Sequence, residues 1–397
     1  MPLSHVEMME NNVKYQPNKK PLNSPYSGAS LDTLAQLGTN SKKRPCKCCS
    51  KGAEAEEDFK LNKGTSVNDK KSLQNRAKRK YLGSALSLGL VQVAEEKRDL
   101  LEQCDIEQYN IEQKKVRSYW NMYHCARKVE TAEGRATTKY CKNRLCIVCN
   151  SIRTAVLINT YQPIIDKWEQ PQFVTLTITN VKAEYLKSSI LEMQKIFNDI
   201  KETIKKRLKR ANLPPMKGLR KMECTYSPIR TDYHPHYHLI IEGKENSEEF
   251  LNLWLERTKH LVTDREGQNI KDAKEGTLQE LFKYFTKVVS SGKNKNDRFI
   301  LLEPLDVISR AIEGTRTFQS FGFKLPKEEP KQATEEQEGE QQTDQEPDAF
   351  VWVQEYSDWV SPITGDMLSG YVATEGMKDI IKTMITTKTK SKQINST

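Results

Sequence analysis

The 397-residue sequence contains no run of 18 consecutive apolar residues, and its first thirty residues include no apolar core of the kind found in signal peptides. We therefore expect neither a membrane span nor secretion, and predict a cytoplasmic protein. The cytoplasm keeps thiols reduced, so disulfides are rare there. The nine cysteines are accordingly interpreted as metal ligands or buried thiols.

The net charge is distributed unevenly along the chain. Residues 327–348 hold nine acidic residues and two lysines, a local charge of −7, whereas the whole chain has a net charge of +10. By subtraction, the other residues carry +17. Such an excess favours an anionic partner, and nucleic acid is the expected one.

Shifts in composition predict an α+β protein in five segments. Residues 1–85 are interpreted as a basic, mostly disordered arm, and residues 86–170 as a helical segment with a four-cysteine zinc site. Residues 171–325 are expected to form a central antiparallel sheet that carries a histidine motif and is flanked by helices. Residues 326–349 form an acidic flexible linker, and residues 350–397 an aromatic C-terminal tail.

Each outer segment has two interpretations. The lysines and arginines of the arm, clustered at 42–51 and 70–80, either hold phosphates loosely or only solubilise a tail. The acidic linker is interpreted as a spacer without a binding role. The aromatic residues of Phe350–Tyr371 predict a small hairpin that docks on the body, with a partner-binding tail as the alternative.

Apolar periodicity predicts the regular elements of the chain. Strands are expected at Phe173–Thr179, Leu219–Tyr226 and Asp232–Ile241, and helical segments at Ser84–Tyr119, Leu186–Leu208, Ser247–Leu261 and Thr277–Val289. The stretch from Lys201 to Lys221 is strongly basic, which suits either a solvated helix face or a track for phosphates.

Three of the six histidines fall within one predicted strand, at positions 234, 236 and 238. Side chains alternate along a strand, so the three imidazoles share one face while Tyr237, Leu239 and Ile241 enter a core. His236 and His238 form a His-hydrophobic-His pair, which indicates a divalent cation site. Mg2+ or Mn2+ is expected, although imidazole also suits Zn2+, Ni2+ and Cu2+. The alternative is a half-exposed strand whose histidines bond to water or backbone.

A third ligand is expected on the preceding strand. The strand at Leu219–Tyr226 ends in a turn at Ser227-Pro228 that leads into the histidine strand, so the two are predicted to pair antiparallel. Glu223 would then lie beside the histidines as a carboxylate ligand, or else form a surface salt bridge.

Four cysteines have the spacing of a zinc site. Cys125, Cys141, Cys146 and Cys149 are separated by fifteen, four and two residues, and the closing Cys-x-x-Cys can place two thiolates on one tetrahedral ion. Four thiolates would saturate zinc, which makes the site structural. His124 is an alternative fourth ligand, and ordinary reduced thiols are the other interpretation. The basic residues Lys142, Arg144 and Arg153 would form a rim for a DNA backbone.

The predicted helix at Thr277–Val289 carries a second group of polar residues. Glu280, Tyr284 and Lys287 follow one another at about one helical turn, so they form a stripe beside the apolar face. A carboxylate, a phenol and an ammonium could meet one phosphate there. The alternative is a capping box at Thr277-x-x-Glu280 with a boundary tyrosine.

The motifs also carry a family resemblance. Cys-x4-Cys-x-x-Cys, Phe-Val-Thr-Leu-Thr, His-Pro-His-Tyr-His-Leu-Ile-Ile and Glu-x-x-x-Tyr with a following Lys occur in that order. This order resembles the plasmid rolling-circle replication initiators of the HUH endonuclease superfamily, of the single-tyrosine type, and the similarity runs from about Cys125 to Gly322. The resemblance implies a nicking and joining nuclease domain at residues 171–325.

The resemblance also implies roles for particular residues. His236 and His238 would bind the catalytic divalent ion, Tyr284 would be the nucleophile, and Glu280 would activate water. We expect Lys287 to assist the tyrosine. The implied substrate is single-stranded or extruded plasmid origin DNA, which Tyr226, Tyr233 and the basic helix would contact.

A host helicase and polymerase are the expected partners, and the sequence indicates no oligomeric state. Two alternatives remain at this stage. One is a conjugative relaxase or single-strand transposase with the same chemistry. The other is a zinc-containing nucleic-acid binder without catalysis.

Overall fold

A computed structural model of the chain describes residues 65–101, 105–132, 134–261, 263–274, 276–282, 289–291, 298–325, 348–379 and 381–382. All of these residues fall within the unit Phe59–Thr397. The predicted basic arm up to residue 64 and the predicted linker at 326–347 lie outside the described residues.

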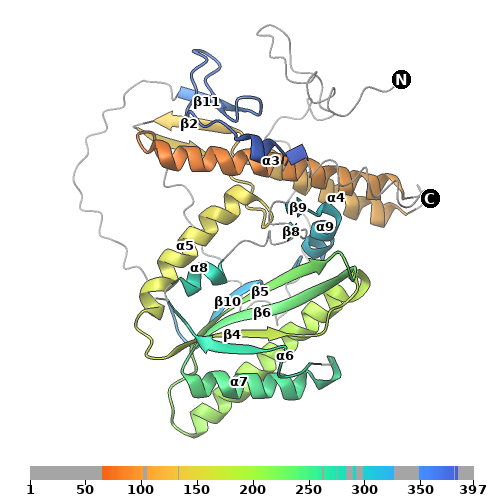
Figure 1. The fold of residues 1–397 in the computed structure, drawn as a ribbon, viewed down its shortest axis with the longest axis vertical. Helices are drawn as coiled ribbons and strands as arrows, with labels where there is room; N and C mark the ends of the chain where they lie inside the picture. The colour runs from red at the N-terminus through yellow and green to blue at the C-terminus, as the bar shows by residue number, and fades with distance from the viewer. Residues whose placement is uncertain are drawn as a thin grey trace, which may run out of the picture. The chain divides into compact units, whose positions relative to one another are not determined.

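The described elements are named in chain order as labelled in Figure 1. The helices are α3 (Lys70–Asp99), α4 (Ile106–Tyr123), α5 (Ile147–Ile165), α6 (Ala183–Arg210), α7 (Lys244–Arg257), the 3-10 helix η1 (Lys259–Leu261), α8 (Thr277–Leu281) and α9 (Leu302–Ala311). The strands are β1 (Thr65–Ser66), β2 (Lys128–Ala132), β3 (Arg135–Thr138), β4 (Pro171–Thr177), β5 (Gly218–Ser227), β6 (Asp232–Glu242), β7 (Asn269–Asp272), β8 (Val289–Ser291), β9 (Arg298–Ile300), β10 (Phe318–Phe321), β11 (Asp348–Val353) and β12 (Asp358–Val360). The fold class is α+β, with antiparallel sheets flanked by helices.

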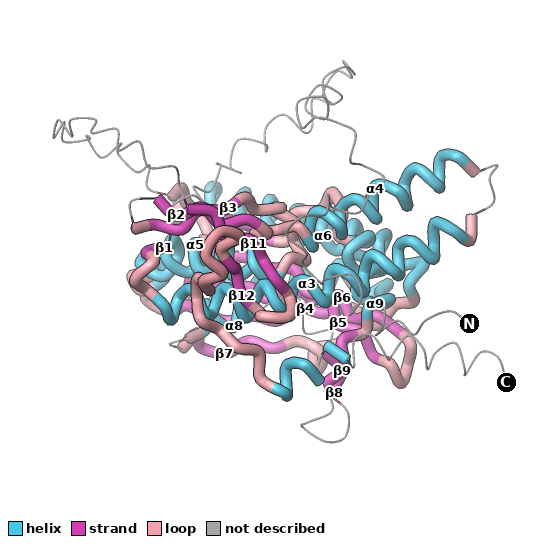
Figure 2. Tube along the Cα trace, turned by 90° about the horizontal axis from the view of Figure 1, so that it is seen from above, coloured by secondary structure: helices cyan, strands magenta, loops and turns pink. Residues whose placement is uncertain are grey.

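Two five-stranded sheets organise these elements. The central sheet has the order β10-β5-β6-β4-β7 and the second sheet the order β1-β3-β2-β11-β12, and all neighbours pair antiparallel. The hairpin expected in the aromatic C-terminal segment is present as β11–β12, and β11 pairs with β2 (Figure 2). The β8–β9 pair forms a separate two-stranded sheet.

The two faces of the central sheet differ in what covers them. Helices α6 and α7 lie on one side, and α5 and α8 on the other (Figure 1). The α6 side is apolar, because β6 sends Tyr237, Leu239 and Ile241 into it as predicted, all at most 1% exposed. The apolar residues of α6 recur every three or four positions, and those buried are Leu186, Ile190, Met193, Ile196, Phe197, Ile200 and Ile204.

The opposite face of the sheet, which we call the histidine face, is only partly apolar. Phe173, Leu219 and Ile240 pack there against residues of α5 and α8. The next residues of the same parity on each strand are polar, so the apolar cover ends where the histidine motif begins.

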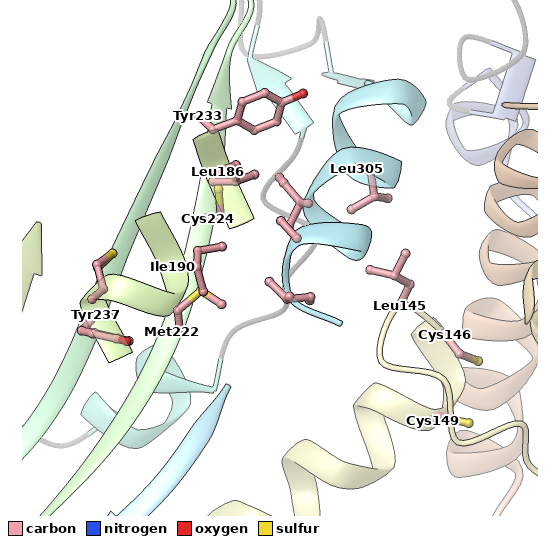
Figure 3. Packing of buried hydrophobic residues seen from close by; sticks show 14 of the residues in the cluster. Leu145, Cys146, Cys149, Leu186, Ile190, Met222, Cys224, Tyr233, Tyr237 and Leu305 are labelled. Carbon is pink, nitrogen blue, oxygen red and sulfur yellow. The ribbon is translucent and has the colours of Figure 1, made fainter. Parts of the chain in front are cut away.

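A buried ionic network joins α9 to the α3–α4 hairpin. Asp306 is fully buried and accepts hydrogen bonds from the Tyr119 hydroxyl at 2.6 Å, from Lys97 at 2.7 Å and from Arg310 at 2.7 Å. Arg310 also forms two bonds of 2.7 Å to Glu112. Figure 3 shows Leu305 of α9 between the sheet and the loop that holds Leu145.

The N-terminal helices differ from the sequence-based expectation. Helix α3 begins at Lys70, where the Asp69 side chain caps it by accepting from the Ser72 amide at 3.0 Å, so residues 70–85 are not part of a disordered arm. Small side chains such as Ala77 let this helix pack closely, so it is buried although its sequence has no strong apolar pattern. The expected helix at Ser84–Tyr119 is two helices, because Asp105 caps a second one.

The helix predicted at Thr277–Val289 is also different. Its described part is the single turn and a half of α8, which ends at Leu281. Val289 does not end a helix but begins β8, where it pairs with Ile300. None of the described helices is long and apolar enough to cross a lipid bilayer.

We predict that Asp306→Asn destabilises the fold by about 3 kcal/mol at neutral pH, because Lys97 and Arg310 lose a buried carboxylate. Burial by itself would raise the pKa of Asp306, but bonds and charges from Arg310 and Lys97 outweigh it and lower that pKa. The carboxylate therefore stabilises the fold above its ordinary pKa of about 4, and this contribution is lost as the pH falls further. Urea unfolding at several pH values should show the variant's deficit shrinking below about pH 4.

The matched control is Glu313→Gln, which removes a surface pair with Lys115 in which the Glu313 side chain is 71% exposed. Its effect should stay within about 1 kcal/mol. Equal effects of the two substitutions would contradict the central role of Asp306.

Candidate metal centre

Two adjacent strands, β5 and β6, bring the predicted ligands together on the histidine face, and β4 flanks them. In the register of the sheet, Glu223 of β5 lies opposite His236 of β6, and Thr175 of β4 lies opposite His238. The antiparallel pairing predicted for the two strands is confirmed. Because side chains directly opposite each other are close neighbours, the register alone gathers these groups.

The two histidines are oriented by hydrogen bonds at their Nδ1 atoms. Nδ1 of His236 lies 3.0 Å from the His234 carbonyl oxygen, which can only accept, so Nδ1 carries the proton. Nδ1 of His238 lies 3.2 Å from Oγ1 of Thr175, and its ring stacks on Phe173 at 5.2 Å between centroids. This leaves Nε2 as the ligand atom of His236 and turns Nε2 of His238 towards the same point.

Glu223 closes the group. Its Oε2 lies 3.8 Å from Nε2 of His236 and 3.6 Å from Nε2 of His238, and the three ligand atoms lie within 4.8 Å of one another. Ligands at about 2.1 Å from one ion are separated by roughly 3 to 4 Å, so the three atoms fit a divalent cation. Three ligands leave coordination positions open, as a catalytic site requires.

His234 shares the face but not the group. Its Nδ1 lies 2.8 Å from Oδ1 of Asn180, whose amide in turn donates to Asp232 at 2.8 Å. The ring stacks on that of His236 with centroids 5.2 Å apart. Burial lowers the pKa of His234 to about 4. His234 thus supports the ring of His236 from the side.

Sequence reasoning missed one member of this centre, Lys221. Its Nζ donates to Oε1 of Glu223 at 2.8 Å, and the two side chains are only 9% and 6% exposed. The signal was available, because Lys221 is two residues before Glu223 and must share its face in a strand. It was hidden in a run of basic residues that suggested a surface.

The last described residues before Tyr284 pack on the same face. Leu278, Leu281 and Phe282 are buried against Leu219 and Ile240. These two residues are each two positions from Lys221 and His238 on their strands, so they lie on the same face of the sheet. Glu280 belongs to α8, whereas Tyr284 and Lys287 lie outside the described residues.

The four cysteines form a second group. Sγ of Cys149 lies 3.5 Å from Sγ of Cys125 and 3.6 Å from Sγ of Cys141, and all four sulfurs, with that of Cys146, lie within 4.8 Å of one another. Sulfurs bound at about 2.3 Å to a tetrahedral zinc are about 3.8 Å apart, so the group is compatible with such an ion. The Cys141 amide also points to Sγ of Cys125 at 3.4 Å.

Two residues next to this cluster, His124 and Lys80, do not make the contacts proposed for them from the sequence. His124 is exposed, and its ring contacts Trp120 and Tyr123 rather than joining the sulfurs. Beneath the cluster, burial lowers the pKa of Lys80 to about 8, opposed by the nearby sulfurs, and its Nζ donates to the Tyr123 carbonyl at 2.6 Å. Lys80 is thus a packing residue and not a loose phosphate contact.

Several residues that were expected to contact DNA either bond to backbone carbonyls or lie away from the histidine face. Arg144 donates to the carbonyl of Thr315 at 2.8 Å, and Arg153 donates to the carbonyl of Lys142 at 3.1 Å, so both guanidinium groups brace the loop. Side chains alternate along a strand, so Tyr226 lies on the same face as Cys224, and Tyr233 on the same face as Tyr237. This is the face opposite the histidines. The basic end of α6 is on that side too (Figure 1).

Comparison with known proteins identifies what this chain is similar to. The profile of a family described as "Replication protein" matches residues 134–250. A protein called "Protein rep" from Staphylococcus aureus is 30% identical over 164 residues, which cover 37% of this chain and 69% of that protein. No solved structure matches the chain.

Two further relatives carry the same name and are covered less fully. "Protein rep" from Streptococcus pneumoniae is 27% identical over 173 residues, covering 38% of this chain and 52% of the relative. The one from Bacillus amyloliquefaciens is 30% identical over 112 residues, covering 27% of this chain and 32% of the relative. The chain thus spans about half of one relative and a third of the other.

We predict that Glu223→Gln weakens Mn2+ binding by about 10-fold to 100-fold, because it removes the only negative ligand of the group. Electron paramagnetic resonance or calorimetry on the protein without DNA measures the affinity. Glu242→Gln is the matched control, since Glu242 pairs with Lys217 at 2.9 Å and is not part of the group. Equal Mn2+ affinities for the wild type and Glu223→Gln would contradict the assignment.

The C-terminal hairpin should protect the cysteines. Trp359 is 3% exposed and donates its Nε1 to the carbonyl of Ala126, next to Cys125, at 2.7 Å. Trp359→Ala is expected to cost about 3 to 5 kcal/mol of packing and to speed labelling of the thiols by a chromogenic disulfide reagent. Tyr356→Ala is the control, because Tyr356 is 59% exposed on the same hairpin. If both variants label at the wild-type rate, the hairpin does not protect the cluster.

Proposed function

This chain belongs to the replication protein family of plasmid initiators, and from that membership we propose that it starts rolling-circle replication by nicking one strand of the plasmid origin. The proposed nucleophile is Tyr284. The products are a 5′-phosphotyrosine link and a 3′-hydroxyl that primes a polymerase, and the protein later rejoins the displaced strand. The proposed place of action is the cytoplasm.

One observation supports the proposal more than any other. The Glu223–His236–His238 group lies on the face of the central sheet against which the start of the tyrosine segment packs. The ring of Phe282, two residues before Tyr284, lies 5.2 Å from the ring of Phe318 on that face. The last described residue before Tyr284 therefore lies on the side of the sheet that a metal-assisted attack requires.

The residues of the centre divide the work of the first step. A divalent ion held by Glu223, His236 and His238 would supply Lewis-acid polarisation of the scissile phosphate. The phenol oxygen of Tyr284 forms a bond to phosphorus, and the bond from phosphorus to the 3′ oxygen breaks. The phenol proton leaves as the 3′ oxygen becomes a hydroxyl. Because a phenol has a pKa near 10, we assign to Lys287 the stabilisation of the developing phenolate.

Covalent attachment also provides for the end of a round. The phosphotyrosine link conserves the ester, so a 3′-hydroxyl can attack it, release Tyr284 and rejoin the strand. We propose that Glu280 acts as a general base for a water in the second cleavage, which removes the need for another tyrosine. The attacking water loses its proton to the Glu280 carboxylate as its oxygen bonds to phosphorus. The bond from phosphorus to the 3′ oxygen breaks, and that oxygen takes up a proton, so the products are a 5′-phosphate and a 3′-hydroxyl.

The proposed substrate is single-stranded or extruded origin DNA, because a duplex encloses its bases. Host helicase and polymerase would unwind and extend from the nick. The four-cysteine cluster is proposed to hold structural zinc, since four thiolates leave no position open for chemistry. Its place next to α5, which packs on the histidine face, would let it brace the nuclease core.

We predict that Tyr284→Phe abolishes the covalent protein–DNA adduct while keeping DNA binding, because only the attacking oxygen is removed. The assay mixes the protein with Mn2+ and a labelled single-stranded origin oligonucleotide, denatures the mixture and resolves labelled protein by gel electrophoresis. Tyr185→Phe is the control, since Tyr185 is 60% exposed on α6, on the other face of the sheet. An adduct that persists in Tyr284→Phe would contradict the assignment. If the wild type binds origin DNA yet forms no adduct, the chain is a binder without catalysis.

A further inference from the structure

Lys221 occupies an unusual position beside the candidate metal ligands. On β5 it lies directly opposite His238, while Glu223 lies opposite His236, so the four side chains form two cross-strand pairs on the histidine face. On its other side, Lys221 lies opposite Phe318 of β10. The ammonium group thus belongs to the centre by its place in the sheet.

The carboxylate of Glu223 divides its two oxygens between different partners. Oε1 accepts from Lys221 Nζ at 2.8 Å, whereas Oε2 lies 3.6 and 3.8 Å from the Nε2 atoms of His238 and His236. A carboxylate held in this way offers one oxygen to an ion, because the other is engaged. Lys221 therefore favours single-oxygen coordination by Glu223 over chelation by both oxygens.

Lys221 also changes the charge of the group. Two neutral imidazoles and one carboxylate sum to −1, and the ammonium brings the four side chains to zero. With a divalent ion in place the group carries +2 instead of +1. At these separations and this degree of burial, a like charge repels the ion and weakens its binding, while an anionic phosphate is attracted more strongly.

The fold gives no separate reason for this ion pair. Away from the histidines, the neighbouring positions of the same face are apolar, with Leu219 and Ile240 fully buried. Removing two charges from water costs more than apolar packing at such a place, so a buried pair is weak support for a purely stabilising role.

We propose that Lys221 is a positioning residue of the nicking centre. It fixes Glu223 as a single-oxygen ligand and offsets its charge, so that the site holds a divalent ion loosely and keeps a positive field for the scissile phosphate. The second half of this statement rests on the proposed function, whereas the first half concerns metal binding alone.

The first test measures Mn2+ affinity without DNA, in the full-length protein, by electron paramagnetic resonance. Lys221→Met removes the charge with little change in volume, and we expect it to bind Mn2+ about ten-fold tighter, because one repelling charge is lost. Lys221→Gln, which keeps a hydrogen-bond donor but no charge, should also bind more tightly. Lys221→Arg keeps the charge and should stay within about three-fold of the wild type.

The matched control is Lys217→Met. Lys217 immediately precedes β5, and the substitution breaks its pair with Glu242 at 2.9 Å while leaving the centre intact. It should not alter Mn2+ affinity. Near-ultraviolet circular dichroism confirms that each variant is folded, and if Lys221→Met is not, the Gln and Arg variants decide. Unchanged or weaker Mn2+ binding by the uncharged variants overturns the proposal.

The second test measures single-turnover nicking of a single-stranded origin oligonucleotide at saturating Mn2+. We expect Lys221→Met to nick at least about ten-fold more slowly although it binds the metal more tightly. Loss of packing alone would weaken both. Nicking at the wild-type rate would overturn the role towards the phosphate. If the wild type does not nick, the proposed function fails, and the Mn2+ affinities still decide whether Lys221 tunes the metal site.

Discussion

The register between β5 and β6 is the constraint on which the rest of the centre depends. A shift of one residue would turn every side chain of β5 to the other face, which would remove Glu223 from the histidines and bury it against α6. The short turn between the two strands holds this register, with Thr231 in the left-handed region at φ 52°. The ligand set is therefore a property of paired strands and not of a loop, so its geometry is as rigid as the sheet.

The same alternation explains why chemistry and stability coexist in β6. The residues of β6 that point towards α6 contribute aromatic and branched side chains to the larger core. Phe197 of α6 contacts Tyr237 there, with ring centroids 5.7 Å apart. The residues between them carry the imidazoles. Because the core face supplies the packing, the histidine face can hold polar groups whose burial alone would disfavour folding. The hydrogen bonds and ion pairs of Asp306 likewise stabilise the packing of α9, the helix that follows Tyr284 along the chain.

Local sequence patterns predicted the elements whose apolar residues recur with a clear period. They also predicted that Glu223 lies beside the histidines, because the short turn between β5 and β6 makes the two strands pair. Strand β6, helix α6 and the Glu223 position belong to this group. The start of α3 was not predicted, because residues such as Ala77 and Ser84 are buried there but are too small to give a strong apolar pattern. Tyr226 was expected to contact DNA, and its place on the face opposite the histidines follows from the side-chain alternation that it shares with Cys224. The bracing role of Arg144 depends on Thr315, which no local pattern connects to it.

The pairing of β11 with β2 joins residues that are at least 217 positions apart in the sequence. A ribosome releases the cysteines and β2 long before residues 348–360, so the edge of the second sheet stays open for most of translation. The Ala126 carbonyl likewise receives its hydrogen bond from the Trp359 indole only after the C-terminal hairpin has been synthesised. A prematurely terminated product keeps exposed thiols and an unpaired strand, both of which invite proteolysis. Quality control of nascent chains would thereby remove incomplete initiators before they reach DNA.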